Sequence, residues 1–440
     1  MASWQKWFWW GLAAAALAAG IFLRLHNASV WNPYWGYDGG AHLRYAEILA
    51  TAGRLPTLEE TYVAWHEPLF YAIAAPIITL SGGAEAAKKT LPYLPAAFGL
   101  LTFFLLGWWS FKRTKQAAAP ALTLLLTAAL PVALTASTFF SNEGLAHLLL
   151  LLALFYAANQ KDPDKKSSAL AAGVIIGLAL LTKVTAFLGL FSIVVWQIYR
   201  FASRLDLPRR SNLGKLLIST LLLAVTALAI ASPWLVTSAK QFGGPFTNTF
   251  EAKKAPGILP PNFFTTLDSN IFFSPFWPAG SNSFWSVVFA ATVTDYDDLL
   301  KNPDQPSPRL RLAQRQLSPR LRLAQRAVWL GAALAPVFLF ALARFLLRAR
   351  KKLTDGDGLL AIFFLGSLAA LIANTVRFGS LERGNAKPIF ILSAVLLAVL
   401  ITAAEITDTT LPSRLRRALT IYTLVVGAAF AANGLMLGWV

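Results

Sequence analysis

Long apolar runs constrain the fold of this chain more than any other feature of its sequence. A run of about 17 to 25 apolar residues is long enough to cross a bilayer as a helix. Such runs lie near 7–25, 91–110, 117–137, 144–159, 216–238, 327–347, 358–376, 388–404 and 418–437, with two more within 168–199. The sequence therefore predicts an all-α polytopic membrane protein with about eleven transmembrane helices.

Composition supports a membrane protein and excludes several kinds of chemistry. Hydrophobic residues make up 56% of the chain and charged residues 14%, whereas a soluble domain has about 25% charged residues. Cysteine is absent, which excludes disulfides, zinc-thiolate sites and thiol nucleophiles. The formal charge of +18 comes without a nucleic-acid recognition motif, so we predict basic loops and no nucleic-acid partner. The run Trp7 to Leu23 lacks a small-residue cleavage site and is predicted to be a retained signal anchor.

Basic loops predict the orientation, because they favour the cytoplasmic side. They lie at 111–115, 161–166, 199–210, 348–352 and 414–417. All five share that side only if the segment 66–80 does not span the membrane. Its apolar part, 68–80, has 13 residues, or about 20 Å of helix against a hydrocarbon core of about 30 Å. We therefore predict that it is an interfacial or re-entrant helix in the first external loop.

Three regions follow from this topology. They are an N-terminal transmembrane module (1–238) with its first external loop (26–90), a long external loop (239–326) and C-terminal transmembrane helices (327–440). The long loop ends in a tandem repeat at 307–326, in which "SPRLRLAQR" occurs twice. The repeat is predicted to extend a basic amphipathic lead-in to the next span. The alternative is a surface that binds anionic membrane lipids.

The stretch "YDGGAHLRYAEILA" (37–50) places an aspartate directly after an apolar run. Asp38 follows aromatic residues suited to the headgroup zone, so its carboxylate should lie at the membrane surface. Partial desolvation there would raise the pKa of Asp38 and make it a better base. The alternative is an ordinary helix N-cap.

Further charged residues collect on the same predicted face. Glu67 and Glu143 add two carboxylates. Four cations stand at span ends, against the positive-inside tendency: Lys183, Arg377, Arg383 and Lys387. The phosphate of a lipid would compensate them and accept charge-assisted hydrogen bonds. The alternative for each cation taken singly is that it extends to a lipid headgroup.

The chain resembles a known family, the GT-C membrane glycosyltransferases that use polyprenyl-phosphate sugars. That group contains the aminoarabinose transferase that modifies lipid A and the protein O-mannosyltransferases. The resemblance lies in "YDGGAHLRYAEILATAGRLP" (37–56), "HEPLFY" (66–71), "SNEGLAHLLLLLALFY" (141–156), "GLALLTKVTAFLGL" (177–190) and "ERGNAKPIFILSAVLLAVL" (382–400). It implies a GT-C-like fold.

The resemblance also implies roles for individual residues. Asp38 would be the catalytic aspartate of the first loop, which accepts the proton of the nucleophile or helps to hold a divalent cation, and Glu143 the second acidic residue. The residues predicted to bind substrate or phosphate are Lys183, Lys387, Arg383, Arg377, His66 and Glu67. Asp38, His42 and His66 have the oxygen and nitrogen ligands of a divalent metal site, and structural hydrogen bonding is the alternative for both histidines.

The predicted function is transfer of a sugar from a polyprenyl-phosphate carrier to a lipid, glycan or protein acceptor. A single displacement at the periplasmic face of the cytoplasmic membrane would invert the anomeric centre. The first alternative is an inactive GT-C-like scaffold, because Gly39 replaces a frequent acidic residue and Glu67 a proline. A transporter is less favoured, since the charged residues stand at span ends rather than within the spans.

Overall fold

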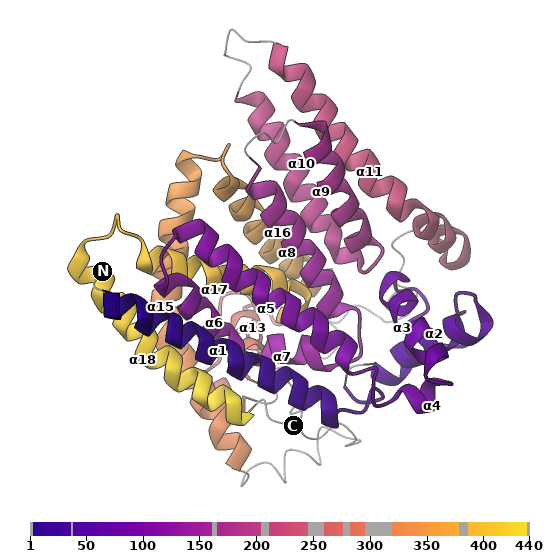
Figure 1. The fold of residues 1–440 in the computed structure, drawn as a ribbon, viewed down its shortest axis with the longest axis horizontal. Coiled ribbons are helices and arrows are strands. Elements are labelled where there is room, and N and C mark those ends of the chain that lie inside the picture. The colour runs from indigo at the N-terminus through magenta and orange to yellow at the C-terminus, as the bar shows by residue number, and fades with distance from the viewer. Residues whose placement is uncertain are drawn as a thin grey trace.

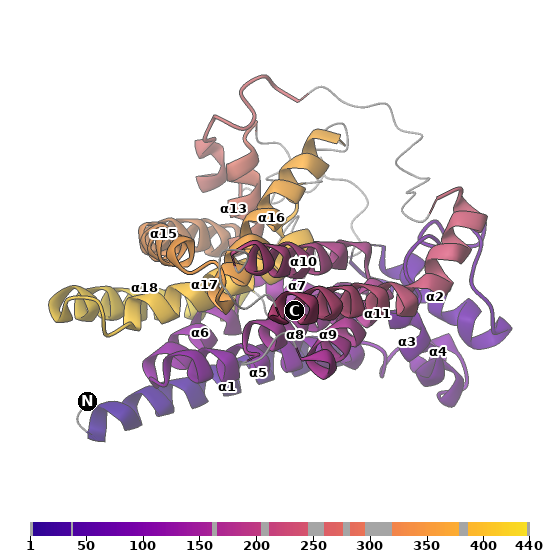
Figure 2. The ribbon, with the colours of Figure 1, turned by 90° about the horizontal axis from the view of Figure 1, so that it is seen from above.

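The computed structural model describes residues 3–36, 38–160, 165–203, 211–244, 259–275, 282–294, 319–377 and 386–437. Every element within these ranges is a helix, and the long helices pack into one bundle (Figure 1). The all-helical membrane class predicted from the apolar runs is confirmed. Three shorter helices, α2, α3 and α4, gather at one side of the bundle in both views (Figures 1 and 2).

The helices follow the predicted spans closely. The α-helices are α1 (Ser3–Val30), α2 (Gly39–Ala52), α3 (Leu69–Leu80), α4 (Ala84–Ala87), α5 (Tyr93–Thr114), α6 (Ala118–Ala128), α7 (Pro131–Thr138), α8 (Glu143–Ala158), α9 (Lys166–Leu180), α10 (Phe187–Ala202), α11 (Ser211–Phe242), α13 (Phe284–Val293), α15 (Pro319–Lys351), α16 (Gly356–Arg377), α17 (Leu392–Thr407) and α18 (Ser413–Leu437). Short 3-10 helices are η1 (Val184–Ala186), η2 (Ser269–Phe272) and η5 (Pro388–Ile391).

Eight of the described helices are long and apolar enough to cross a membrane, or nine if the bent pair α6 and α7 forms one span. The two members of this pair meet at 66°. The break follows from Pro131, which begins α7 and forces Leu130 into an extended conformation. Helices α8 and α9 have 16 and 15 residues, so these two predicted spans are shorter than expected.

Helix α3 has the length that the interfacial or re-entrant prediction requires. Its 12 residues extend about 18 Å, well below the thickness of a hydrocarbon core. It packs on α2 through Tyr45 and Tyr71, whose ring centroids lie 3.8 Å apart. The backbone N–H of Leu69, the first residue of α3, donates to the carbonyl of Leu181 at 2.9 Å. The first loop is therefore attached to the turn that follows α9.

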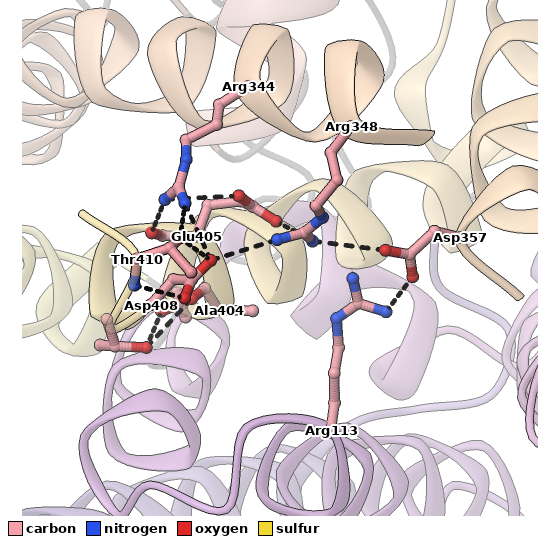
Figure 3. Close-up of polar contacts among 10 residues, drawn as sticks. Arg113, Arg344, Arg348, Asp357, Ala404, Glu405, Asp408 and Thr410 are labelled. Carbon is pink, nitrogen blue, oxygen red and sulfur yellow. Dashed lines mark hydrogen bonds and ion pairs between the residues drawn. The ribbon is translucent and has the colours of Figure 1, made fainter. Parts of the chain in front are cut away.

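A cluster of six charged residues joins the ends of several helices (Figure 3). It joins α5, α15, α16 and α17 with the residues that follow α17, and consists of Arg113, Arg344, Arg348, Asp357, Glu405 and Asp408. The basic loops 111–115 and 348–352 adjoin this cluster and so share one end, as the topology predicts. Ala158, the last residue of α8, lies against Gly356 beside this cluster, so Glu143, the first residue of α8, lies toward the opposite end.

The N-terminal and C-terminal regions are in contact, because α6 packs against both α17 and α18. The predicted boundary at residue 238 falls inside α11. In the tandem repeat, residues 307–318 lie outside the described residues, and the remainder forms the start of α15.

Candidate functional site

A buried ion pair lies at the centre of the candidate site. Lys183 Nζ donates to Glu143 Oε1, and both residues are 8% exposed. His147, one turn further along α8, places its Nε2 3.3 Å from Glu143 Oε2. The ring of Phe390 lies 5.3 Å from Lys183 Nζ. A charged pair this well buried is surrounded by partners on several helices, which fixes its position.

Local backbone structure brings these two residues together. Glu143 begins α8, where the helix dipole favours a carboxylate. Lys183 has an extended conformation between α9 and η1, in the turn where the apolar run 168–199 is interrupted. Asn142 joins this turn to the first loop, because its Nδ2 donates to the Thr182 carbonyl at 2.8 Å and to His66 Nδ1 at 3.2 Å.

Glu67 adds a second carboxyl group beside the ion pair. It is 6% exposed and accepts a hydrogen bond from the backbone N–H of Val184. Its Oε2 has no hydrogen-bond partner among the described residues. Burial raises the pKa of Glu67 to about 7, although the charge of Lys183 lowers it. The segment 66–68 thus brings two of the predicted binding residues, His66 and Glu67, next to Lys183.

Asp38 occupies the N-cap position of α2, but its side chain does not cap the helix. Its carboxylate instead accepts a hydrogen bond from the Tyr62 hydroxyl at 2.5 Å. The backbone of Asp38 is left-handed, with φ of 54°, a conformation that few residues other than glycine adopt. The N-cap alternative therefore does not describe this side chain, which is exposed to solvent.

His42 connects Asp38 to the buried pair. It is 4% exposed, and its backbone N–H donates to the Asp38 carbonyl at 2.9 Å. Its Nδ1 lies 2.6 Å from the Tyr71 hydroxyl, and its ring centroid lies 5.2 Å from that of His66. Asp38 and Lys183 thus lie on the same side of the bundle.

The histidines make the structural hydrogen bonds that were the alternative to metal binding. The Nδ1 atoms of His42 and His66 are bonded to Tyr71 and Asn142. Throughout the part of the chain that the structure describes, no three His, Asp or Glu side chains form a group that could hold a metal ion. A divalent metal site at Asp38, His42 and His66 stays a prediction from the sequence.

Protonation of His42 is expected to destabilise the fold in acid. Burial lowers the pKa of His42 from 6.5 to about 4, so the folded state favours the neutral ring. This stabilisation is complete above pH 6.5 and is lost as the pH falls toward 4, with a change of about 3 kcal/mol. Unfolding curves of the wild type and His42→Gln between pH 7 and pH 4 would measure it. Parallel curves for the two proteins would contradict the assignment.

The other cations predicted to bind phosphate are Lys387, Arg377 and Arg383. Lys387 directly precedes η5, whose Ile389 carbonyl accepts from His147 Nε2 at 2.7 Å, so its backbone borders the site. Arg377 is the exposed last residue of α16. Arg383 lies outside the described residues.

Sequence reasoning missed three residues of the site. His147 follows Glu143 by four residues, which places both on one face of α8, and a histidine in an apolar run is itself a signal. Asn142 and Tyr62 carried no comparable signal, because their partners are 40 and 24 residues away along the chain.

Comparisons with known proteins give structural neighbours only. No family model and no curated protein sequence matches this chain. The crystal structure of ArnT from Cupriavidus metallidurans bound to undecaprenyl phosphate is 16% identical and gives a TM-score of 0.41, with 94% of this chain and 77% of ArnT covered. Its apo structure is 18% identical with a TM-score of 0.39, and the covered shares are 90% and 76%.

A third neighbour is the arabinofuranosyltransferase AftD from Mycobacteria, seen by cryo-EM. It is 15% identical with a TM-score of 0.47, and the match covers 96% of this chain but 26% of AftD. The chain is thus similar to these proteins along nearly its whole length. Because all three TM-scores lie below 0.5, the function proposed below rests on the site.

Proposed function

We propose that this protein transfers a sugar from a polyprenyl-phosphate carrier to an acceptor at the end of the bundle that holds Glu143 and Lys183. The observation that supports the proposal best is the placement of Lys183, Glu143 and Asp38 on one side of the bundle. These residues belong to three motifs that resemble the GT-C glycosyltransferases, and they are far apart in the sequence. The end opposite the basic loops corresponds to the periplasmic face of the cytoplasmic membrane.

In the proposed reaction, the donor phosphate replaces Glu143 as the partner of Lys183. The acceptor hydroxyl or amine attacks the anomeric carbon while its proton passes to the Asp38 carboxylate. The bond between the anomeric carbon and the phosphate oxygen breaks, and its electron pair stays on that oxygen. Lys183 stabilises the charge that develops there. A single displacement of this kind inverts the anomeric centre.

The membrane contributes by restricting the donor. A polyprenyl tail in the bilayer keeps the phosphate near the surface where Asp38 and Lys183 lie. Positioning of this kind can supply a large part of the rate enhancement, because it replaces an encounter in solution by reaction between held groups. A lipid, a glycan or a protein with a hydroxyl or amine group would each serve as the acceptor in this reaction.

Gly39 stands where the related family frequently has an acidic residue. This difference has a steric reason and does not by itself imply an inactive scaffold. A Cβ atom on residue 39 would approach the Pro33 carbonyl oxygen to 2.8 Å. An acidic side chain therefore cannot follow Asp38 without displacing the backbone of residues 33–34. Glu67, the second departure, places an additional carboxyl group in the site instead of disrupting it.

Asp38→Asn tests the proposal. The substitution keeps the shape of the side chain and removes the base, so we expect transfer to fall about 100-fold. Membranes containing the protein would be supplied with radiolabelled polyprenyl-phosphate sugars, and incorporation into acceptor fractions would be measured. NMR of the product would give the anomeric configuration.

Glu85→Gln is the matched control for this experiment. Glu85 is an exposed carboxylate that, like Asp38, accepts a hydrogen bond from a tyrosine, with Tyr34 at 3.1 Å. We expect it to keep wild-type transfer. Equal rates in the two variants would remove Asp38 from the reaction. Absence of transfer from every donor by the wild type would favour the inactive scaffold.

A further inference from the structure

The structure contains a buried cation that the proposed reaction does not use. Arg24 lies in the membrane-spanning helix α1 and is 2% exposed. Its Nη1 donates to the carbonyls of Gly20 at 3.0 Å and Ala128 at 3.1 Å, and its guanidinium lies 4.9 Å from the centre of the Phe103 ring. No carboxylate interacts with it among the described residues. A buried charge without a counter-charge is costly, by several kcal/mol.

The contacts of Arg24 compensate only part of its charge. Ala128 is the last residue of α6, so its carbonyl belongs to the negative end of that helix. A helix end carries roughly half an elementary charge. About half of the charge on the guanidinium is therefore uncompensated. The Nε of Arg24 is also buried and has no hydrogen-bond partner in the described part of the chain.

A cavity of about 20 Å³ adjoins this guanidinium. Residues from α1, α5, α6, α7, α8 and α17 line it, among them Arg24, Gly99, Thr102, Thr127, Ser137 and His147. The three hydroxyl groups donate to carbonyls of their own helices. A Cβ on Gly99 would lie 2.3 Å from Ser137 Cβ and 3.3 Å from Arg24 Nε, so the glycine keeps space open beside Nε.

We infer that this cavity binds one small monovalent anion of about the size of chloride. A cavity needs about 10 to 15 Å³ to hold a water molecule, so this one accommodates a single particle of similar or slightly larger size. A water molecule would satisfy Nε but would leave the charge uncompensated. Sulfate and phosphate are too large for the cavity. The inference rests on Arg24 and its cavity and is independent of the proposed transferase activity.

The test is thermal unfolding of the full-length protein in detergent at constant ionic strength. Sodium gluconate is replaced stepwise by sodium chloride. Because a ligand that binds only the folded state raises its stability, we expect a saturating increase in Tm of about 2 °C. Bromide should act like chloride, whereas sulfate should have no effect. A flat chloride titration or an equal response to sulfate would overturn the inference.

Two variants assign the effect to the site. Arg24→Gln should lose the chloride response, and Arg54→Gln, which removes an exposed arginine paired with Glu60, should keep it. An unchanged response in Arg24→Gln would overturn the inference. If that variant does not fold, anomalous scattering from wild-type crystals grown in bromide decides the question. Bromide density beside Arg24 Nε supports the site, and its absence there at saturating bromide overturns it.

Discussion

Replacing Lys183 with methionine is expected to lower the rate of sugar transfer about a thousandfold. Lys183 is the buried cation of the site, and in the proposed reaction it stabilises the charge on the departing phosphate. Loss of one preorganised group of this kind costs about 10²- to 10³-fold in rate. Methionine keeps the length of the side chain and removes the charge. Transfer from labelled polyprenyl-phosphate sugar in membranes, measured at saturating donor, gives the effect.

Two comparisons separate catalysis from folding in this experiment. Lys88→Met removes a half-buried lysine that is paired with Glu85 in the first loop, and it should transfer at close to the wild-type rate. Lys183→Met leaves Glu143 buried and unpaired, so the protein should also lose stability. The double variant Lys183→Met with Glu143→Gln should recover stability without recovering transfer. Wild-type turnover by Lys183→Met would reject the role assigned to this lysine.

Replacing Glu405 with glutamine is expected to destabilise the protein by about 2 kcal/mol. Glu405 is 1% exposed and bonds Arg348, and its second oxygen lies 3.6 Å from Arg344 Nη1. Arg344 and Arg348 keep Asp408 and Asp357 as partners in this variant, so the expected loss is that of the charge-assisted hydrogen bond to Glu405. Thermal unfolding in detergent and denaturant titration would both measure the loss.

Glu47→Gln provides the matched control for Glu405. Glu47 pairs with Arg44 at 2.8 Å on the exposed surface of α2, where an ion pair contributes about 0 to 1 kcal/mol. The two substitutions make the same chemical change at a buried acid and at a partly exposed one. Equal stability of the two variants would show that the charged cluster at this end of the bundle does not hold the helices together.

Length and apolarity predict where the long helices lie, but not how many can cross a membrane, since eight or nine of the described helices do so by length and composition against about eleven predicted. The short helix α3 followed from the same reasoning. The break between α6 and α7 did not, because Pro131 within an apolar run is compatible with a kink, a break or a continuous helix. The burial of Arg24 could not be predicted for a related reason. A single arginine near the end of a long apolar run does not prevent that run from spanning the membrane.

The sequence indicates some residues of the candidate site, but not His147, Asn142 or Tyr62 and not the contacts within it. Asp38, Glu143 and Lys183 were selected from motifs and from the predicted topology. That Glu143 pairs with Lys183 depends on how α8 packs beside the turn after α9, and no local pattern encodes that packing. The ion pairs around Arg348 could not be predicted either. From the sequence, the arginines of the basic loop at 348–352 indicate only topology, because their acidic partners on α16 and α17 are far away along the chain.

The pairing of Lys183 with Glu143 has a consequence for selectivity among anions. A carboxylate attached to the same scaffold competes for the ammonium group at a high effective concentration. Free inorganic phosphate in the surrounding water, at ordinary concentrations, cannot displace it. A phosphate held beside the lysine by its own hydrocarbon tail reaches a comparable local concentration and can. In the proposed reaction, the internal carboxylate would thereby favour a phosphate on a lipid tail over free phosphate.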